Sequence, residues 1–242
     1  MKGLTIEVCE STNQLAKEQG SLGAPHGFWV SADRQTQGRG RWGREWQSLD
    51  GNLFLSIILR PKRSDHWTWI PMCSALAVLE TLHLRWPSLR LSIKWPNDLW
   101  LDGKKLAGLL CESFSGQTQD PFLVLGLGLN LREAPQGLDQ ETAALGVQDQ
   151  QTLELLREEI SMRVAQSIDR LDSEGTAWVE ALFWSHAQFG KGCGVTWRAA
   201  DSRVLEGRVH SLGKHGELWI EAEGSRFALY AEEIKGLRSA GD

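Results

Sequence analysis

The chain has 242 residues, of which 41% are hydrophobic and 24% are charged, as in an ordinary soluble globular protein. The formal net charge of −5 argues against general nucleic-acid binding, which relies on an excess of basic residues. The four cysteines form no C-x-x-C pair, the six histidines show no zinc spacing, and no apolar run is long enough to span a membrane. We therefore expect a cytoplasmic protein without a membrane partner, whose cysteines are small buried hydrophobes.

Near the N-terminus the pattern predicts a strand, a helix and a second strand, over residues 4–9, 15–19 and 28–32. A polar triplet stands directly before the helix: Ser11, Thr12 and Asn13. Taken alone, the triplet is explained better by simple N-capping of that helix than by a binding role. Gln35 follows the second strand, just before a segment rich in glycine and arginine.

Residues 38–46 combine three glycines with three arginines and two tryptophans. The glycines permit a sharp bend or a close approach to a ligand: Gly38, Gly40 and Gly43. The arginines each offer a planar fork of donors that fits a carboxylate or a phosphate: Arg39, Arg41 and Arg44. We expect a loop that closes over an anionic, partly aromatic ligand, and the alternative is a solvated basic loop.

The spacing of these glycines also matches the dinucleotide-binding pattern G-x-G-x-x-G. That pattern needs a strand before it, a helix that opens at it, and an acidic residue about twenty positions further on. Here the segment leads instead into an apolar strand over residues 53–59. A Rossmann site is therefore not expected.

The middle of the chain predicts a helix with an apolar face over residues 67–86 and a strand over residues 91–94. The sequence Trp-Pro-Asn-Asp at residues 95–98 favours a turn. This turn would place three polar side chains close together at the strand end: Lys94, Asn97 and Asp98.

Residues 99–114 predict a hairpin around Asp102 and Gly103, with Lys105 just after the turn. A lysine in that position is usually solvated, so its functional role depends on other evidence. Residues 122–130 are apolar apart from two glycines and the final asparagine, Asn130. They suit a central strand that a neighbouring group or a ligand approaches closely.

In the last part of the chain, the predicted secondary structure changes from helices to short strands. An irregular connection over residues 132–150 leads to two helices, over residues 153–171 and 176–186. From residue 190 onward, short strands alternate with glycine-rich turns, which predicts a compact β module of about fifty residues similar to an SH3-like barrel. We expect an α+β protein with a domain over residues 1–189 and a small SH3-like β-barrel domain over residues 190–242.

Taken together, several of these segments resemble one family, the biotin protein ligases. The resemblance rests on the polar triplet, Gln35, the G-R-G-R-x-G-R-x-W loop, the K-W-P-N-D segment and the K-L-A-G segment at residues 105–108. It implies a catalytic domain built on a mixed β-sheet covered by helices. It also implies an ATP-dependent enzyme, a biotin–[biotin carboxyl-carrier protein] ligase, that uses biotin, ATP and Mg²⁺.

In the implied reaction, the biotin carboxylate attacks the α-phosphate of ATP and forms biotinyl-AMP and pyrophosphate. Two anions must meet while negative charge develops on phosphoryl oxygens, so positioned cations are the main catalytic requirement. By resemblance, the catalytic cations are Lys105, Arg39 and Arg41. A lysine of a biotin carboxyl carrier domain, of acetyl-CoA carboxylase or a similar enzyme, then displaces AMP.

The resemblance also implies binding roles. The biotin site comprises Ser11, Thr12, Asn13, Gln35, Gly38, Arg39, Gly40, Arg41, Lys105 and Gly108. The ATP and adenylate site comprises Arg44, Trp46, Lys94, Asn97, Asp98 and Asn130. Asp98 is the candidate for orienting Mg²⁺-bound phosphate.

Some members of this family carry an N-terminal helix-turn-helix domain and repress transcription. Here the polar triplet arrives at residue 11, which leaves no room for such a domain, so we expect no DNA partner. Two alternatives stay open: a lipoate or octanoate ligase or transferase of related fold, and a binding module that senses a small ligand or docks on RNA. The oligomeric state, monomer or homodimer, is also open.

Overall fold

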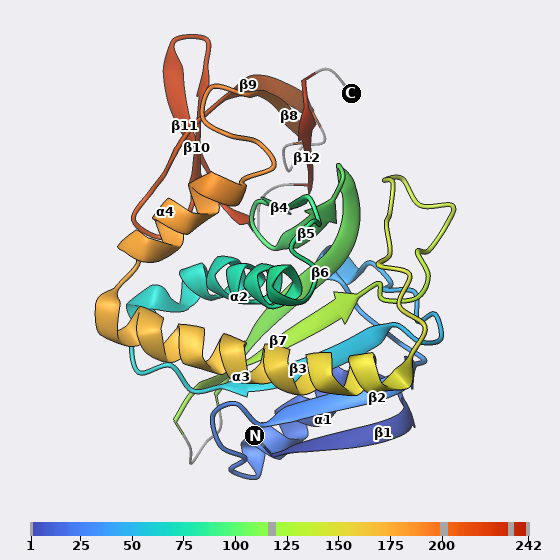
Figure 1. Ribbon diagram of the computed structural model, residues 1–242. Helices are drawn as coiled ribbons and strands as arrows, with labels where there is room; N and C mark the ends of the chain where they lie inside the picture. The colour runs from blue at the N-terminus through green and yellow to red at the C-terminus, as the bar shows by residue number, and fades with distance from the viewer. Residues whose placement is uncertain (1, 116–119, 199–202, 232–234, 241–242) are drawn as a thin grey trace.

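The computed structural model describes residues 2–115, 120–198, 203–231 and 235–240 (Figure 1). Within these ranges, seven strands form one sheet in the order β1-β2-β3-β7-β6-β5-β4. They are β1 (Gly3–Cys9), β2 (Trp29–Gln35), β3 (Leu53–Leu59), β4 (Leu91–Lys94), β5 (Asp98–Leu101), β6 (Lys104–Phe114) and β7 (Phe122–Leu129). β1 and β2 are parallel and the other neighbours are antiparallel, so the expected mixed sheet and α+β class are confirmed.

The α-helices of the described residues divide between the two faces of this sheet. They are α1 (Thr12–Ser21), α2 (Ile70–Arg85), α3 (Gln150–Glu174) and α4 (Ala177–His186). Figure 1 shows α2 and α3 side by side in front of the sheet, with α1 on the opposite face. The alternation of side chains along each strand therefore decides which residues meet α2 and which meet α1.

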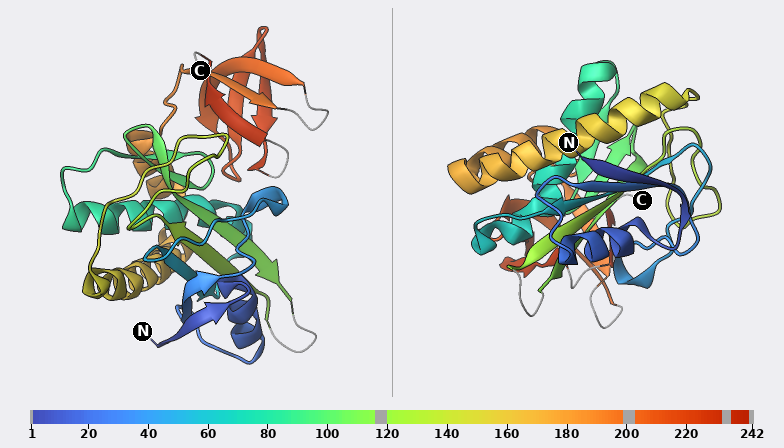
Figure 2. Two further views of the ribbon diagram at one scale, coloured as in Figure 1. Left: turned by 90° about the vertical axis from the view of Figure 1, so that its right-hand side faces the viewer. Right: turned by 90° about the horizontal axis from the view of Figure 1, so that it is seen from below.

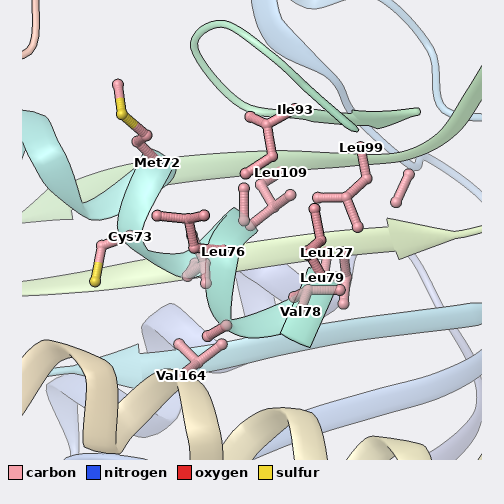
Figure 3. Packing of buried hydrophobic residues seen from close by; sticks show 14 of the residues in the cluster. Met72, Cys73, Leu76, Val78, Leu79, Ile93, Leu99, Leu109, Leu127 and Val164 are labelled. Atoms are coloured by element: carbon pink, nitrogen blue, oxygen red, sulfur yellow. The ribbon is translucent and has the colours of Figure 1, made fainter. Parts of the chain in front are cut away.

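Every residue of β3 is buried, although the strand has two different faces. Leu53, Leu55 and Ile57 pack in the large core with α2 and α3, whereas Ile58 joins a smaller cluster with Ala16 of α1. Figure 3 shows the large core from close by, with Leu76 and Leu79 of α2 lying against the sheet. A strand covered on both faces has a nearly continuous apolar sequence, and residues 53–59 have that sequence.

The helix expected over residues 67–86 is wrong at its start. Ser64–Trp69 forms a 3₁₀-helix, and the α-helix α2 begins only at Ile70, with Pro71 in its first turn. Proline is favoured there because that position has no intrahelical partner for an N–H group. The hairpin after β5 agrees with its prediction: Asp102 and Gly103 both have positive φ, at 50° and 77°. Two such residues form the tight turn that matches the twist of adjacent strands.

A second sheet follows α4. In the described part of the chain it has five antiparallel strands in the order β11-β10-β9-β8-β12. They are β8 (Gly194–Arg198), β9 (Val204–Leu212), β10 (Leu218–Ala222), β11 (Ser225–Leu229) and β12 (Lys235–Ser239). Figure 2 shows this sheet at one end of the molecule. The sequence did not predict β12, because its five residues are mostly polar and include a glycine.

Two indole groups, one at the end of the 3₁₀-helix before α2 and one in the turn after β4, join the second sheet to the rest of the chain. Trp69 Nε1 donates to the carbonyl of Lys214 and Trp95 Nε1 donates to the carbonyl of Gly216, both at 2.9 Å. Both acceptors lie in the turn between β9 and β10. None of the helices within the described ranges has the length and apolar character that crossing a lipid bilayer requires.

Two neighbouring leucines of α3 give a matched test of the packing. Leu156 is fully buried, whereas Leu155 is 42% exposed. Leu156→Ala should lower the free energy of unfolding by roughly 2–5 kcal/mol, because it removes buried methyl groups and leaves a cavity. Leu155→Ala should change it by less than about 0.5 kcal/mol. Urea denaturation of the two variants measures the difference, and equal losses would contradict this placement of α3.

Candidate functional site

A cavity of about 650 Å³ lies on the α1 face of the large sheet. Its walls come from the start of α1, two glycine-containing strands, two loops and the second sheet. Ala231 and Leu237 of the C-terminal region both line it. Segments that are far apart in the sequence therefore meet around one space.

Glycines of β6 and β7 form the floor of the cavity. A Cβ atom at Gly126 would lie 2.3 Å from Asn13 Oδ1, and one at Gly128 would lie 2.3 Å from the indole ring of Trp46. Gly108 is the cross-strand neighbour of Gly128. A side chain at Gly126 or Gly128 would displace Asn13 or Trp46, so the close approach predicted at the strand of residues 122–130 is confirmed.

The polar triplet faces this cavity. In the described part of the chain the Ser11 side chain caps no backbone N–H of α1, so the simple capping explanation is wrong. The backbone N–H and hydroxyl groups of Thr12 lie 2.8 and 3.0 Å from Gln35 Oε1. Thr12 and Asn13 are buried, and their side chains join a network at one end of the cavity.

Two members of this network were missed by the sequence reasoning. The Ser56 hydroxyl lies 2.6 Å from Asn13 Oδ1 and 2.8 Å from Thr12 Oγ1, and Asn13 Nδ2 donates to Glu112 Oε2 at 2.7 Å. Ser56 is fully buried. The signal that could have found Ser56 is a lone hydroxyl within the otherwise apolar strand of residues 53–59. Glu112 gave no local signal, because only the strand pairing of β6 brings it to Asn13.

Lys105 stands at the other end of the cavity. Its Nζ donates to Asp98 Oδ2 at 2.9 Å and lies 5.5 Å from the centre of a Trp46 ring. The side chains of Lys105 and Asp98 are only 15% and 19% exposed. The alternative of a solvated lysine does not hold for Lys105, because the β5–β6 hairpin places its side chain in the cavity wall.

Arg41 connects the glycine-arginine loop to both sheets. Its Nη1 donates to Asn97 Oδ1 at 3.1 Å, and its Nη2 donates to the carbonyl of Ala231. The loop is compact, because Gly40 N donates to Arg44 O and Trp46 N donates to Gly38 O. The loop therefore folds as a short hairpin that lies against the cavity.

Two buried polar atoms in the cavity wall are unpaired. Asn130 Oδ1 and Trp46 Nε1 find no hydrogen-bond partner among the residues that the structure describes. The Asn130 amide is anchored on its other side, where Nδ2 donates to Ala143 O at 3.0 Å. Because an unpaired buried polar group costs free energy, these atoms are suited to a ligand.

The predicted site residues are brought together by this arrangement. All of them except Gly38 line the cavity: Ser11, Thr12, Asn13, Gln35, Arg39, Gly40, Arg41, Arg44, Trp46, Lys94, Asn97, Asp98, Lys105, Gly108 and Asn130. Gly38 lies beside it, where a Cβ atom would meet the carbonyl of Trp46 at 2.7 Å. Their individual roles stay predictions.

Among the described residues, no cysteine lines the cavity and no dedicated metal cage is present. Burial raises the pKa of the Cys111 thiol to about 12, and the neighbouring Glu112 carboxylate adds to that shift. The thiol is therefore protonated at neutral pH. No group of three or more His, Cys, Asp or Glu side chains within the described ranges could hold a metal ion.

Comparison with known proteins gives concordant matches. The model of the biotin/lipoate A/B protein ligase family matches residues 5–130. The chain is 35% identical over 137 residues to the bifunctional ligase/repressor BirA of Bacillus subtilis, covering 56% of this chain and 42% of that protein. It is 36% identical over 143 residues to a biotin–[acetyl-CoA-carboxylase] ligase of Mycobacterium tuberculosis, covering 56% and 51%.

The chain thus spans about half the length of these relatives. A solved structure agrees over a greater length. The biotin protein ligase of Aquifex aeolicus in complex with biotin and ATP superposes with a TM-score of 0.82 at 26% identity, covering 99% of each chain. The similarity therefore includes the C-terminal sheet as well as the region that the family model matches.

Removal of the Ser56 hydroxyl tests the polar network. Ser56→Ala should destabilise the protein by roughly 1–3 kcal/mol, because Asn13 Oδ1 loses its donor in a buried position. Ser88→Ala is the matched control, since Ser88 is exposed in the loop between α2 and β4. Thermal unfolding followed by circular dichroism measures both variants. An unchanged midpoint for Ser56→Ala would show that the network does not stabilise the fold.

Proposed function

The chain belongs to the biotin/lipoate A/B protein ligase family, and from this premise we propose that it is a biotin protein ligase. It activates biotin with ATP to form biotinyl-5′-AMP, and then transfers biotin to a lysine of a biotin carboxyl carrier domain. The observation that carries this proposal is the chemistry of the cavity, which has a hydroxyl and amide network at one end and cations at the other.

Biotin has complementary ends. Its ureido ring carries two N–H donors and a carbonyl acceptor, which match the side chains of Thr12, Asn13 and Gln35. Its carboxylate is an anion, which matches Lys105 and the arginines of the loop. The similarity to a ligase solved in complex with biotin and ATP supports a site that takes both ligands.

Adenylation needs two anions held together. A carboxylate oxygen of biotin attacks the α-phosphorus of ATP, a new P–O bond forms, and the bond to the departing pyrophosphate breaks. We assign to Lys105 the contact with the carboxylate and the α-phosphate, because a fixed cation there stabilises the charge that develops in the transition state. The ion pair with Asp98 holds the Lys105 ammonium group in place before ATP arrives. Arg39, Arg41 and Arg44 would bind further anionic oxygens of biotin and ATP.

The nucleotide would occupy the wall formed by Trp46, Asn97 and Asn130. An adenine ring can pack against the Trp46 indole, and the unpaired Asn130 Oδ1 can accept from an N–H group of the nucleotide. Lys94 lies nearby with its ammonium group 4.4 Å from the centre of a Trp100 ring. These contacts agree with the nucleotide roles that the sequence implies.

The described residues offer few protein ligands for Mg²⁺. Asp98 is the candidate ligand, but its carboxylate pairs with Lys105. Mg²⁺ usually keeps several waters and binds through one or two carboxylates together with substrate phosphates. We therefore propose that Mg²⁺ comes with ATP and neutralises phosphate charge there, with Asp98 as its nearest protein group.

In the second step the carrier lysine attacks the acyl carbon of biotinyl-AMP, and AMP leaves. The Mycobacterium tuberculosis relative is a biotin–[acetyl-CoA-carboxylase] ligase, which supports the carrier domain of that carboxylase, or of a similar enzyme, as the partner. We also propose that residues 190–242 form a small domain that completes the site. Ala231 and Leu237 line the cavity, which supports this proposal.

The main rival is a lipoate or octanoate ligase, because the family includes both chemistries. Neither lipoate nor octanoate carries an N–H donor for the network around Asn13, so the polar end of the cavity favours biotin. ATP–pyrophosphate exchange separates the candidates. Exchange should require biotin, octanoate should not replace it, and a ligand sensor or RNA-binding module would show no exchange.

Two adjacent lysines give a matched test of the adenylation step. Lys105→Ala should slow biotin-dependent pyrophosphate exchange by about a hundredfold or more, because it removes a cation from the transition state. Biotin binding should weaken less than the rate falls. Lys104→Ala is the control, since Lys104 is half exposed and pairs with Glu141 on the surface. Wild-type exchange in Lys105→Ala would contradict the assigned role.

The loop of residues 37–45 should respond to ligands. Its arginines repel one another until an anion binds, and its glycines make an ordered backbone entropically unfavourable. We therefore expect biotin plus ATP to increase the protection of these amides from hydrogen exchange. Arg41→Gly removes the contacts with Asn97 and Ala231, so it should release biotinyl-AMP faster and biotinylate bystander lysines. Equal protection with and without ligands would argue against ordering.

A further inference from the structure

Glu112 lies at the outer edge of the polar network and has no role in the reaction as described. Its Oε2 accepts from Asn13 Nδ2 at 2.7 Å, and the side chain lines the cavity. We propose that Glu112 is a positioning residue that fixes the direction of the hydrogen bonds around the ureido ring of biotin. In this way it selects ligands with ring N–H groups. The inference rests on the proposed biotin ligase function and adds a specificity determinant to it.

The first step is the orientation of the Asn13 amide. A carboxylate has acceptor atoms only, so the amide group that faces Glu112 has to be Nδ2, the donor. The amide oxygen Oδ1 then faces Ser56 at 2.6 Å. Without Glu112, the Ser56 hydroxyl could pair with either end of the amide, because a hydroxyl both donates and accepts. Glu112 therefore distinguishes the two orientations of Asn13.

The second step follows the protons. An amide oxygen only accepts, so the single proton of the Ser56 hydroxyl goes to Asn13 Oδ1. Thr12 Oγ1 lies 2.8 Å from Ser56 Oγ and 3.0 Å from Gln35 Oε1, and it donates its own proton to one of these two acceptors. Both hydroxyl protons are therefore used inside the network. Toward the cavity, Thr12 Oγ1 can offer only a lone pair.

The third step concerns the ligand. Gln35 Oε1 is held by the backbone N–H of Thr12 at 2.8 Å, which leaves Gln35 Nε2 as a donor. Asn13 Nδ2 keeps one further proton, and Glu112 keeps its second carboxylate oxygen. The pocket thus presents an acceptor at Thr12 and donors at Gln35 and Asn13. This set matches a ring that carries N–H groups beside a carbonyl, whereas an alkyl chain would leave these polar atoms without a partner in the ligand.

Loss of the carboxylate should therefore weaken biotin binding without slowing the chemistry. In Glu112→Ala the amide of Asn13 can turn, so that Nδ2 donates to the Ser56 hydroxyl and the acceptor Oδ1 replaces the Asn13 donor in part of the population. Glu112→Gln keeps the shape and one acceptor but adds a donor, so both orientations of Asn13 become available. Its effect should have the same sign and be smaller.

The experiment measures biotin-dependent ATP–pyrophosphate exchange in the full chain for the wild type, Glu112→Ala, Glu112→Gln and the control Glu158→Gln. Glu158 is exposed on α3, outside the cavity wall. In Glu112→Ala we expect the KM for biotin to rise by about tenfold or more, since the Asn13 amide is no longer held with its donor available to the ligand. The KM for ATP and the kcat should stay within about twofold of the wild type if the role is positional.

Two further ligands separate positioning from general damage. Desthiobiotin keeps both ureido N–H groups, so its KM should rise by the same factor as that of biotin. Octanoate has no N–H group, so its inhibition constant against biotin should be the same in Glu112→Ala as in the wild type. Circular dichroism of each variant confirms that it folds.

The outcomes are distinct. Absence of biotin-dependent exchange in the wild type would reject the ligase function and the inference with it. Normal exchange in the wild type, with an unchanged biotin KM in Glu112→Ala, would overturn the inference and leave the ligase function standing. A parallel loss of affinity for biotin, ATP and octanoate would also overturn it, because a general structural effect would then explain the result.

Discussion

The site depends on one constraint, the lack of side chains at Gly126 and Gly128 on the central strand of the large sheet. The Cβ positions of these two residues are already occupied, by Asn13 from α1 and by Trp46 from the loop. A polar group and an aromatic ring therefore lie directly on the backbone of β7. Gly128 of β7 pairs with Gly108 of the neighbouring strand β6. The same open surface therefore continues towards Lys105. The shape of the cavity follows from these missing side chains.

The opposite face of the same strand explains why this surface can be rigid. Leu125, Leu127 and Leu129 alternate with the glycines and are almost fully buried in the core with α2. Successive side chains of a strand point to opposite faces, so one short sequence supplies both a packed core and an open floor. A well-packed interior has low compressibility, so the strand above it is held firmly in place. Sites built on strands also hold their groups more accurately than sites built on loops. The conformational change that we expect on ligand binding can then be confined to the glycine-arginine loop.

Local sequence predicted most of the elements and many polar residues of the cavity wall, but it missed the parts of the wall that only the tertiary fold brings in, such as Pro135, Thr142 and Leu237. Thr12, Asn97 and Lys105 belong to short motifs that together resemble one family, so each could be marked without knowing the fold, although each segment alone also fits a plain structural role. Glu112 meets Asn13 only because β6 and β7 pair in one register, and a residue 99 positions away gives no local signal. The strand β12 was missed for a similar reason, since its few polar residues are ordered by pairing with β8. The sequence pattern of a segment predicts its local structure. Its contacts with distant segments depend on how the strands pair, which the pattern does not show.

The link between the two sheets passes through the site itself. Trp95 lies in the turn that carries Asn97 and Asp98, and its indole N–H donates to Gly216 in the second sheet. Arg41 reaches the carbonyl of Ala231 from the other side of the cavity. The turn and the loop are therefore both tied to the C-terminal sheet. This junction also accounts for part of the unusual count of twelve tryptophans. An indole fills an apolar gap with a large ring while its single N–H fixes the orientation, and a junction between two sheets needs both properties.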